Sequence, residues 1–389
     1  MKKILTLALL FCFVVAEDEF FEPGVSLGGY GEMHYNNWVD PDDSDAEPET
    51  KLDFHRWILF VNYNFTPEWS LKSEVELEHN MVGGSYGGYM ELEQAYINYH
   101  NADGNWGWGA GTMLISAGII NETHEPPTFL SVERPAYNSK IIPTTWFGNG
   151  FMAYKSFGDI HAKFVLHEDM NGDGMLGDGA FSGLRGGRAK GYKSTAYHWT
   201  KNMSVHYTGM EGVNVGGSYT FGGAPTGLGD VHTEYVDWNL FEVHAQYDAN
   251  NIIGSFEYGT VNFAHEADNG LNDDGTDLVL PDQVASGYYF HVGYNVADMM
   301  GWEDCKLVPW FGMNNYDLND LDEDGGAEDT VSSTLLGLTW WPTDKVSFKI
   351  DYDMQTTKGD GLGLVDAEGN LLDPDSKKNT LSIGVGYMF

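Results

Sequence analysis

Two short acidic runs place oxygen-bearing side chains at the spacing of a calcium-binding loop. The six side chains are Asp169, Asn171, Asp173, Asp320, Asp322 and Asp324. Oxygen ligands at positions one, three and five, with a glycine at six, form the first half of an EF-hand loop. Position twelve should be a glutamate, but Ala180 and Val331 stand there. We therefore exclude EF-hands and keep two hypotheses, weak calcium binding or chance recurrence of Asp and Gly in an acidic chain.

Charged side chains also recur at every second position within otherwise apolar stretches. Glu74, Glu76 and Glu78 alternate with Val75 and Leu77. A period of two puts the charges on one face of a strand and the apolar residues on the other. The same alternation elsewhere completes the charged set Arg56, Lys72, Glu74, Glu76, Glu78, Lys163, Glu242, Lys349, Asp351 and Asp353. Such a face either selects ions that pass along it or forms ion pairs that stabilise the wall, and the sequence leaves both open.

No residue set nominates an enzyme. His161 and His167 lie six residues apart on one face of an expected strand, which does not suit a compact metal site. The Gly83-Gly84 and Gly186-Gly187 pairs lack the strand-to-helix context of a phosphate-binding loop. We therefore expect no catalytic residues and no required cofactor, with calcium in the acidic loops as the one candidate ligand.

The composition excludes two further classes of protein. The formal charge of −38 leaves nothing to neutralise the phosphates of a nucleic acid. Of the two cysteines, Cys12 lies in a leader segment and Cys305 has no intrachain partner, so a disulfide-stapled module is excluded. The leader is residues 1–16, where two lysines precede an apolar run that ends before Glu17, as in a secretory signal peptide. We expect residues 17–389 to form a single domain.

The apolar alternation recurs along the whole chain. The last example is Leu381 to Phe389, where bulky residues alternate with Ser382, Gly384 and Gly386. The expected strands are 24–38, 52–65, 69–80, 89–100, 106–116, 148–157, 159–167, 195–208, 213–221, 235–248, 252–263, 285–297, 304–316, 331–341, 346–354 and 379–389. Repeats of about ten residues are the length at which a tilted strand crosses a membrane.

The connections between these strands alternate in length. Those at 66–68, 101–105, 158, 209–212, 249–251, 298–303 and 342–345 are short, while those between them are mostly long and often acidic. A transmembrane antiparallel barrel has this asymmetry, because short turns lie at one rim and long loops at the other. Tryptophans near the strand ends fit the aromatic girdles of such a barrel. The sequence therefore predicts an all-β barrel of about 16 strands in a bacterial outer membrane.

The third long connection, 117–147, differs from the other long connections. It mixes apolar residues, prolines and a few charges, as a segment that packs inside a barrel requires. Parts of the chain resemble the outer-membrane porins called phosphate-selective porins O and P. The matching stretches are Gly28 to Glu32, Leu52 to Arg56, Glu74 to His79, Glu91 to Tyr96, and Gly118 to Phe129 with Glu133-Arg134-Pro135.

That resemblance implies a trimeric channel of sixteen strands whose third loop folds inward as a constriction. The candidate constriction residues are then Asn121, Glu122, His124, Glu125, Glu133, Arg134 and Lys140. Phosphate selectivity in the family rests on lumenal arginines and lysines, whereas the charged set here mixes both signs. Since rings of side-chain charge set pore selectivity, we expect weak cation preference or near neutrality, and no saturable phosphate site.

The predicted function is passive diffusion of small hydrophilic solutes or ions through an outer-membrane porin. The expected partners are membrane lipid, lipopolysaccharide, the solutes and two further copies of the chain. Two alternatives stay open at this point: a barrel that serves as a surface adhesin or structural protein through its acidic loops, and a barrel enzyme.

Overall fold

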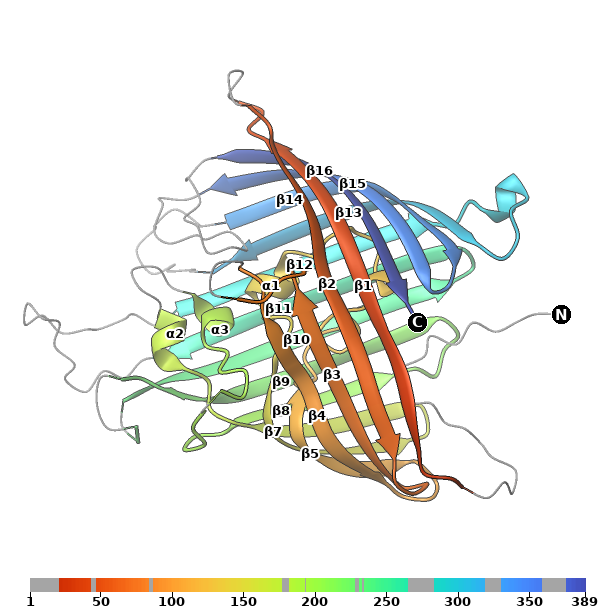
Figure 1. Cartoon of the computed structure of the whole chain (residues 1–389). Coiled ribbons are helices and arrows are strands. Elements are labelled where there is room, and N and C mark those ends of the chain that lie inside the picture. The colour runs from red at the N-terminus through yellow and green to blue at the C-terminus, as the bar shows by residue number, and fades with distance from the viewer. Residues whose placement is uncertain are drawn as a thin grey trace, which may run out of the picture.

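The chain folds into a closed barrel of sixteen antiparallel strands (Figure 1). The computed structural model describes residues 21–42, 47–83, 87–176, 182–192, 194–227, 231–232, 234–264, 283–318, 330–358 and 376–389. Each strand pairs with its neighbour in the chain, and the first pairs with the last. Closure removes every sheet edge, which is the condition for a sheet to sit in lipid.

The strands lie close to the expected ranges. They are β1 (Gly24–Val39), β2 (Glu49–Asn64), β3 (Trp69–Glu78), β4 (Met90–His100), β5 (Trp106–Leu114), β6 (Phe147–Phe157), β7 (Ile160–His167), β8 (Thr200–Tyr207), β9 (Val213–Pro225), β10 (Tyr235–Ala249), β11 (Ile252–Ala264), β12 (Gln283–Tyr294), β13 (Lys306–Asp317), β14 (Thr330–Thr343), β15 (Val346–Lys358) and β16 (Lys377–Met388). The barrel prediction is confirmed. The largest difference is at β8, which begins five residues later than expected because the residues before it belong to the preceding connection.

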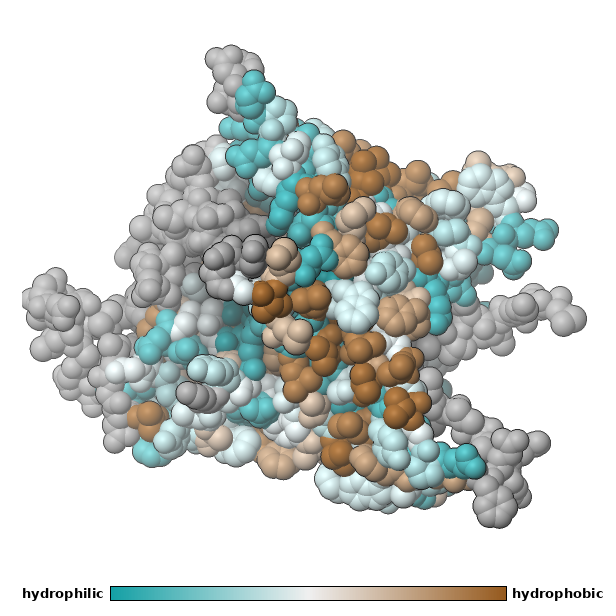
Figure 2. Space-filling view, in the orientation of Figure 1, coloured by the Kyte–Doolittle hydropathy of each residue, from teal (hydrophilic) through white to brown (hydrophobic). Residues whose placement is uncertain are grey.

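Alternation along the strands produces an apolar outer surface. Phe241, Phe348 and Ile350 are exposed on that surface, whereas Glu242 and Lys349, next to them in sequence, are buried inside. Figure 2 shows hydrophobic side chains gathered over the strands at the front of the barrel. An outer surface of this kind matches a hydrocarbon environment, and the charged inner face matches an aqueous or protein-filled interior.

Short turns join β2–β3, β4–β5, β6–β7, β8–β9, β10–β11 and β14–β15. Asn250 and Asn251, which join β10 to β11, both have positive φ, as a two-residue hairpin of type I′ requires. The β12–β13 connection at the same rim is longer and contains the 3₁₀ turn η2 (Asp298–Met300). Helices α2 (Gly172–Leu176) and α3 (Gly183–Gly186) lie at the opposite rim (Figure 1). Among the described residues, no helix has the length and apolar character to cross a membrane.

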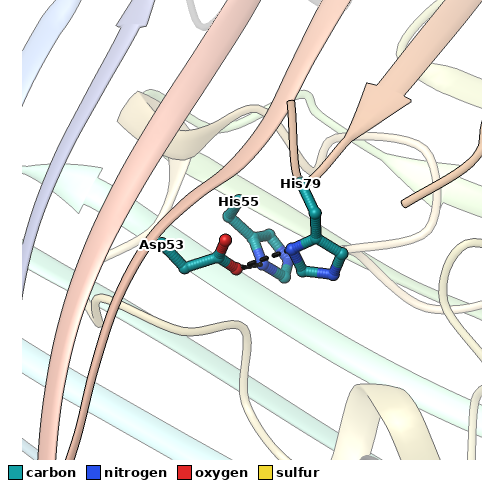
Figure 3. A group of neighbouring side chains, drawn as sticks. All are labelled: Asp53, His55 and His79. Carbon is teal, nitrogen blue, oxygen red and sulfur yellow. Dashed lines mark ion pairs between the residues drawn. The ribbon is translucent and has the colours of Figure 1, made fainter. Parts of the chain in front are cut away.

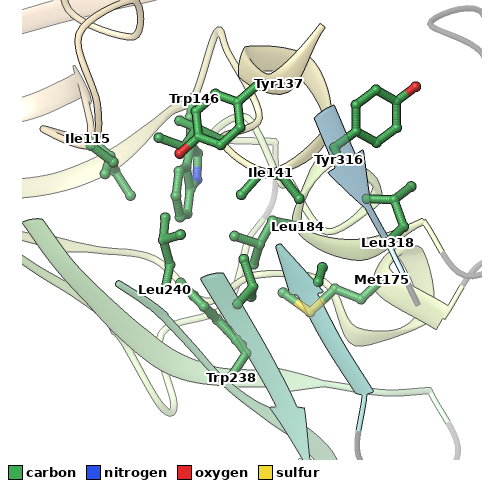
Figure 4. Packing of buried hydrophobic residues seen from close by; sticks show 14 of the residues in the cluster. Ile115, Tyr137, Ile141, Trp146, Met175, Leu184, Trp238, Leu240, Tyr316 and Leu318 are labelled. Carbon is green, nitrogen blue, oxygen red and sulfur yellow. The ribbon is translucent and has the colours of Figure 1, made fainter. Parts of the chain in front are cut away.

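Two connections enter the barrel and form its core. The first inner segment is residues 115–146, with the 3₁₀ turn η1 (Pro126–Thr128) and helix α1 (Tyr137–Lys140). The second inner segment is the described part of residues 168–199, which carries α2 and α3. Figure 4 shows Tyr137, Ile141 and Trp146 of the first segment packed with Met175 and Leu184 of the second. Inward residues of β9 to β14, such as Trp238 and Leu240, complete this apolar core.

Candidate functional site

The first inner segment is fixed at both ends before it crosses the barrel. The amide nitrogen of Asn121 donates to the carbonyls of Ile115 and Trp146 at 2.7 and 3.0 Å, and its oxygen accepts from the Trp146 N–H at 2.7 Å. Asn121 is fully buried. This candidate constriction residue therefore closes the base of the segment instead of facing a channel.

Charged residues of the wall bind the backbone of the first inner segment. The Val132 N–H donates to Asp351 on β15 at 2.6 Å, and Lys349 donates to the Ser131 carbonyl at 2.7 Å. On the same side of the barrel, separated from β15 by β16 and β1, Arg56 on β2 donates to the His124 carbonyl at 3.3 Å. These three side chains are almost fully buried. They are paired with polar backbone, as buried charge requires, and have little contact with water.

Glu242 and Glu257 hold the start of the same segment. The Gly118 N–H donates to Glu242 at 3.2 Å, and the Ile119 N–H donates to Glu257. Asn138 on α1 also donates to Glu257, at 2.6 Å. Two lumenal glutamates, on β10 and β11, therefore position the segment through its backbone and one side chain.

A second group of candidate residues faces the interior with partial exposure. Glu122 forms an ion pair with Lys163 on β7, and both side chains are about one quarter exposed, at 27% and 22%. Enclosure alone would raise the pKa of Glu122, but the Lys163 ammonium lowers it below its usual value. Glu122 therefore stays ionised next to a lysine, and the pair is nearly neutral as a unit.

Glu133 is the most exposed charge of the first inner segment. Its side chain is 47% exposed and contacts Nδ1 of His34 at 2.8 Å and the amide of Asn36 at 3.0 Å. Enclosure in the barrel would raise the pKa of Glu133, but the charge and hydrogen bond of His34 outweigh it and hold the pKa at about 2. Glu133 is a permanent negative charge at neutral pH.

The remaining candidates fall in different places. Glu125 and Lys140 are buried, and Arg134 is half-buried. Enclosure raises the pKa of Glu125, because burial disfavours its charged form more than nearby His124 stabilises it. Lys72 and Glu78 are half-buried on β3. The candidates therefore do not form one ring around a common opening.

The second inner segment is bound to the first through arginine. Arg188 donates to the carbonyls of Thr145 and Pro143 at 2.7 and 3.4 Å, and Arg185 donates to the Thr144 carbonyl at 3.1 Å. Lys190 reaches Glu91 on β4 at 2.6 Å. Sequence reasoning treated this connection as an exposed loop. Met175, Leu184 and the glycines of this connection do not recur at the spacing of a helix or a strand. Its packed helices could therefore not be predicted from the sequence.

The first calcium run lies at the start of this second segment. Asp169 accepts hydrogen bonds from the backbone N–H groups of Tyr197, His198 and Trp199 at 2.6–2.8 Å and from the Thr195 hydroxyl. Asp173 instead accepts from the Gly227 N–H. The two carboxylates therefore serve different backbone segments. The second run, Asp320, Asp322 and Asp324, lies outside the described residues, and calcium binding stays a prediction.

Two β-bulges redirect side chains into the barrel. In β2, Glu32 pairs with Arg56 while His34 pairs with Asp53, so one residue between them is extra. In β4, Glu74 pairs with Gln94 and Val75 with Leu92, which leaves Glu93 unpaired. A bulge of this kind bends the strand and turns consecutive residues to one face. The sequence alternation therefore breaks at both places.

The bulge in β2 brings together a cluster near the outer end of the strands. Asp53 Oδ2 lies 2.7 Å from Nδ1 of His79 and 3.6 Å from Nδ1 of His55 (Figure 3). The Lys51 ammonium is 3.6 Å from the same oxygen. His55 also stacks on His34 with ring centroids 5.1 Å apart. We name Asp53, His55 and His79 the mouth cluster. Sequence reasoning missed it, since its histidines come from a bulge and from the connection after β3.

Comparison with known proteins agrees with this architecture. No family model matches the sequence. An uncharacterized protein of Aquifex aeolicus (strain VF5) is 31% identical over 347 residues, which is 85% of this chain and 75% of the Aquifex protein. The chain belongs to the same family as this Aquifex protein.

Solved structures similar to this chain are outer-membrane porins and channels. An anion-selective porin from Comamonas acidovorans has a TM-score of 0.61 at 11% identity, over 95% of this chain and 100% of the porin. The outer membrane channel DcaP of Acinetobacter baumannii has a TM-score of 0.59 at 11% identity, over 94% and 97%. OmpF of Salmonella typhi has a TM-score of 0.56 at 12% identity, over the same shares. The chain is a porin-like barrel, and at these identities the likeness shows the fold alone.

Proposed function

We propose that this protein is an outer-membrane porin that lets small hydrophilic solutes or ions diffuse passively across the membrane. The observation that carries the proposal is a closed barrel with an apolar outside, a charged inside and two inner segments anchored across it. A barrel that served only as a surface scaffold would have no need of charged residues that hold a segment within the interior. We assign it no enzymatic role.

The inner segments are expected to set the size limit of the channel. Their anchors are buried hydrogen bonds to Asp351, Lys349 and Glu257, each worth more than an exposed ion pair. A segment held at so many points keeps a fixed width on the time scale of solute passage. The mixed charges of the interior do not favour phosphate over other small solutes.

The electrostatic filter is expected to lie on the exposed charges of the interior. Arg56, Lys349 and Asp351 are covered by the first inner segment and are paired with its backbone. Glu133 is exposed and negative but pairs with His34, and the Glu122–Lys163 pair is nearly neutral. We therefore expect weak cation preference or near neutrality, in contrast to the Comamonas porin, whose name describes it as anion-selective.

We also propose an outer-membrane location and a homotrimer. The apolar outer surface fits a membrane whose spanning proteins are barrels, with lipid and lipopolysaccharide against it. One similar structure, OmpT of Vibrio cholerae, is described as a trimer form, with a TM-score of 0.57 at 13% identity. Chemical cross-linking of the folded protein in detergent should yield a ladder that ends at three chains.

The experiment that tests the proposed function is conductance across a planar lipid bilayer. Folded protein should run differently in gels before and after boiling, and the same preparation should produce discrete conductance steps. Protein that is folded by the gel test but gives no conductance steps would contradict the channel function and leave the surface-scaffold function as the alternative. A boiled-denatured sample serves as the control for leakage caused by detergent.

A further inference from the structure

Three side chains from distant parts of the chain converge beneath the first inner segment. They are Glu74 on β3, Glu93 on β4 and His124 of the segment itself. Nε2 of His124 lies 3.7 Å from an oxygen of Glu74 and 3.6 Å from an oxygen of Glu93. The three side chains are 2%, 1% and 3% exposed, respectively, so water has almost no access to them.

Two of the three groups lack hydrogen-bond partners among the described residues. Neither carboxylate oxygen of Glu93 has a hydrogen bond there, and neither has Nε2 of His124, whereas the facing oxygen of Glu74 accepts from the Tyr30 hydroxyl at 3.4 Å. A buried carboxylate without hydrogen bonds is costly, because desolvation of the charge is not compensated. A cation in the space between these atoms would supply the compensation.

The other side of the imidazole defines which nitrogen is available. Nδ1 of His124 lies 3.2 Å from the carbonyl oxygen of Asn121. A carbonyl only accepts, so Nδ1 carries the proton and donates it there. When the ring is neutral, Nε2 presents a lone pair toward the two carboxylates. This arrangement, with Nδ1–H on a backbone carbonyl, is the one that orients metal-binding histidines.

The separations fit ligands that share one ion. Ligand bonds of about 2.0–2.2 Å in a tetrahedral site put ligand atoms about 3.3–3.6 Å from each other. The 3.6 and 3.7 Å separations are too long for hydrogen bonds and close to that range. We propose that Glu74, Glu93 and His124 bind a divalent first-row transition metal ion, such as Zn²⁺. Mixed imidazole and carboxylate ligands favour such an ion over Ca²⁺ or Mg²⁺, which take oxygen ligands.

Outer groups support two of the three ligands. Gln94 donates to the second oxygen of Glu74 at 2.6 Å. The bulge in β4 explains how Glu93 and Gln94, adjacent in sequence, both contact this inner cluster. Glu76 and Glu91 also have carboxylate oxygens within 4.8 Å of Glu93, and Lys190 already pairs with Glu91. Glu76, whose Oε1 has no hydrogen bond among the described residues and lies 3.9 Å from the Arg56 guanidinium, is the nearby carboxylate that can complete the coordination.

A protonated His124 is the competing explanation. An imidazolium would form ion pairs with Glu74 and Glu93 without any metal. His124→Lys separates the two readings, since lysine keeps a positive charge but is a poor ligand beside these carboxylates. Glu93→Gln keeps the size of the side chain and removes its charge. The mouth cluster is a second possible metal site, so His79→Gln is the matched control.

The test is Zn²⁺ titration of the folded, tag-free protein in detergent, after dialysis against a chelator. Calorimetry should show one tight site, and Zn²⁺ should raise the melting temperature. Loss of a direct ligand in Glu93→Gln or His124→Lys should weaken binding by more than about 100-fold, while Gln94→Leu should weaken it by about 10- to 100-fold. His79→Gln should bind as the unaltered protein does. Replacement of Zn²⁺ by Co²⁺ should give visible absorption that the Glu93→Gln variant lacks.

Three results would overturn this assignment. The first is absence of Zn²⁺ binding by the folded protein. The second is binding that His79→Gln abolishes and Glu93→Gln leaves intact, which would place the ion in the mouth cluster. The third is binding and melting temperature unchanged in His124→Lys, which would identify His124 as a counter-ion only. None of these readouts uses conductance, so the metal site and the channel can fail independently.

Discussion

The carboxylate of Asp351 on β15 accepts a hydrogen bond at 2.6 Å from the backbone N–H of Val132, a residue of the first inner segment. Lys349 lies two residues before Asp351 on the same face and donates to the carbonyl of Ser131 at 2.7 Å. One strand therefore presents an acceptor and a donor to the N–H and the carbonyl of a single peptide group, the one that joins Ser131 to Val132. The position of that segment depends directly on this pair.

Asp351→Ala should loosen the first inner segment. The buried Val132 N–H would lose its acceptor, at a cost of about 1–3 kcal/mol. Single-channel recordings should then show larger and noisier conductance steps. Asp353→Ala is the control, because the carboxylate of Asp353 contacts Ser333 of the wall. Equal conductance in the two variants would contradict the anchoring role of Asp351.

Leu184→Ala should destabilise the protein through its interior. Leu184 on α3 is fully buried among side chains of both inner segments and the wall, so its removal leaves a cavity. The loss in unfolding free energy should be about 2–5 kcal/mol, measured by denaturant titration of the folded barrel in detergent. Leu336→Ala on the outer surface should cost less, because lipid or detergent fills the space. A larger loss for Leu336→Ala would mean that the interior core contributes little.

The reversal potential across a salt gradient should show weak cation preference that fades as salt rises, because salt screens exposed charge. Glu133→Gln should shift it toward anions, while Glu91→Gln, which leaves its partly buried partner Lys190 unpaired, should act mainly on stability. Because the pKa of Glu133 is held at about 2, its charge is constant from pH 5 to pH 8. Its folded-state ion pair is present above the ordinary glutamate pKa and is lost only as pH falls toward 2. Strong anion selectivity, or block of current by micromolar phosphate, would contradict this prediction.

Asp169→Ala should lower stability whether or not calcium is present. Its carboxylate accepts three backbone N–H groups, and hydrogen bonds to a charged group are worth about 1.5–3 kcal/mol each. Thermal melting with a chelator and with millimolar calcium gives the comparison. A calcium-dependent melting temperature that Asp173→Ala removes would support the calcium hypothesis. Identical curves in both conditions would leave Asp169 as a structural acceptor alone.

The sequence was sufficient for the barrel because lipid imposes a strict alternation on the outer face. Phe348, Ile350 and Tyr352 point to the membrane, and the period of two shows this directly. The interior has no comparable rule. Ion pairs and hydrogen bonds, such as that from Arg56 to the His124 carbonyl, depend on which residue of the inner segment lies next to each wall residue. No local sequence pattern predicts that contact.

The candidate site was foreseen in part. The segment 117–147 was expected to fold inward, and its backbone contacts with the wall have the geometry for that. The residues expected to line an opening include Asn121 and Lys140, which are buried instead. Their types are those of channel residues, and only packing reveals their surroundings. The bulge at Glu93 could not be predicted, because in the sequence a single extra residue only interrupts the alternation of apolar and polar residues.

The contacts of the first inner segment also set an order for assembly of the barrel. Its hydrogen bonds to β14 and β15 join residues 209 and 219 positions apart, as in Thr339 to the Leu130 carbonyl and Val132 to Asp351. Strands β5 and β6, which flank the segment, come much earlier in the chain. The segment therefore stays without these contacts until the last quarter of the chain is in place. Pairing of β1 with β16 and binding of the segment to the wall must then be completed together. A barrel that closed around an unbound segment would have to rearrange its interior afterwards.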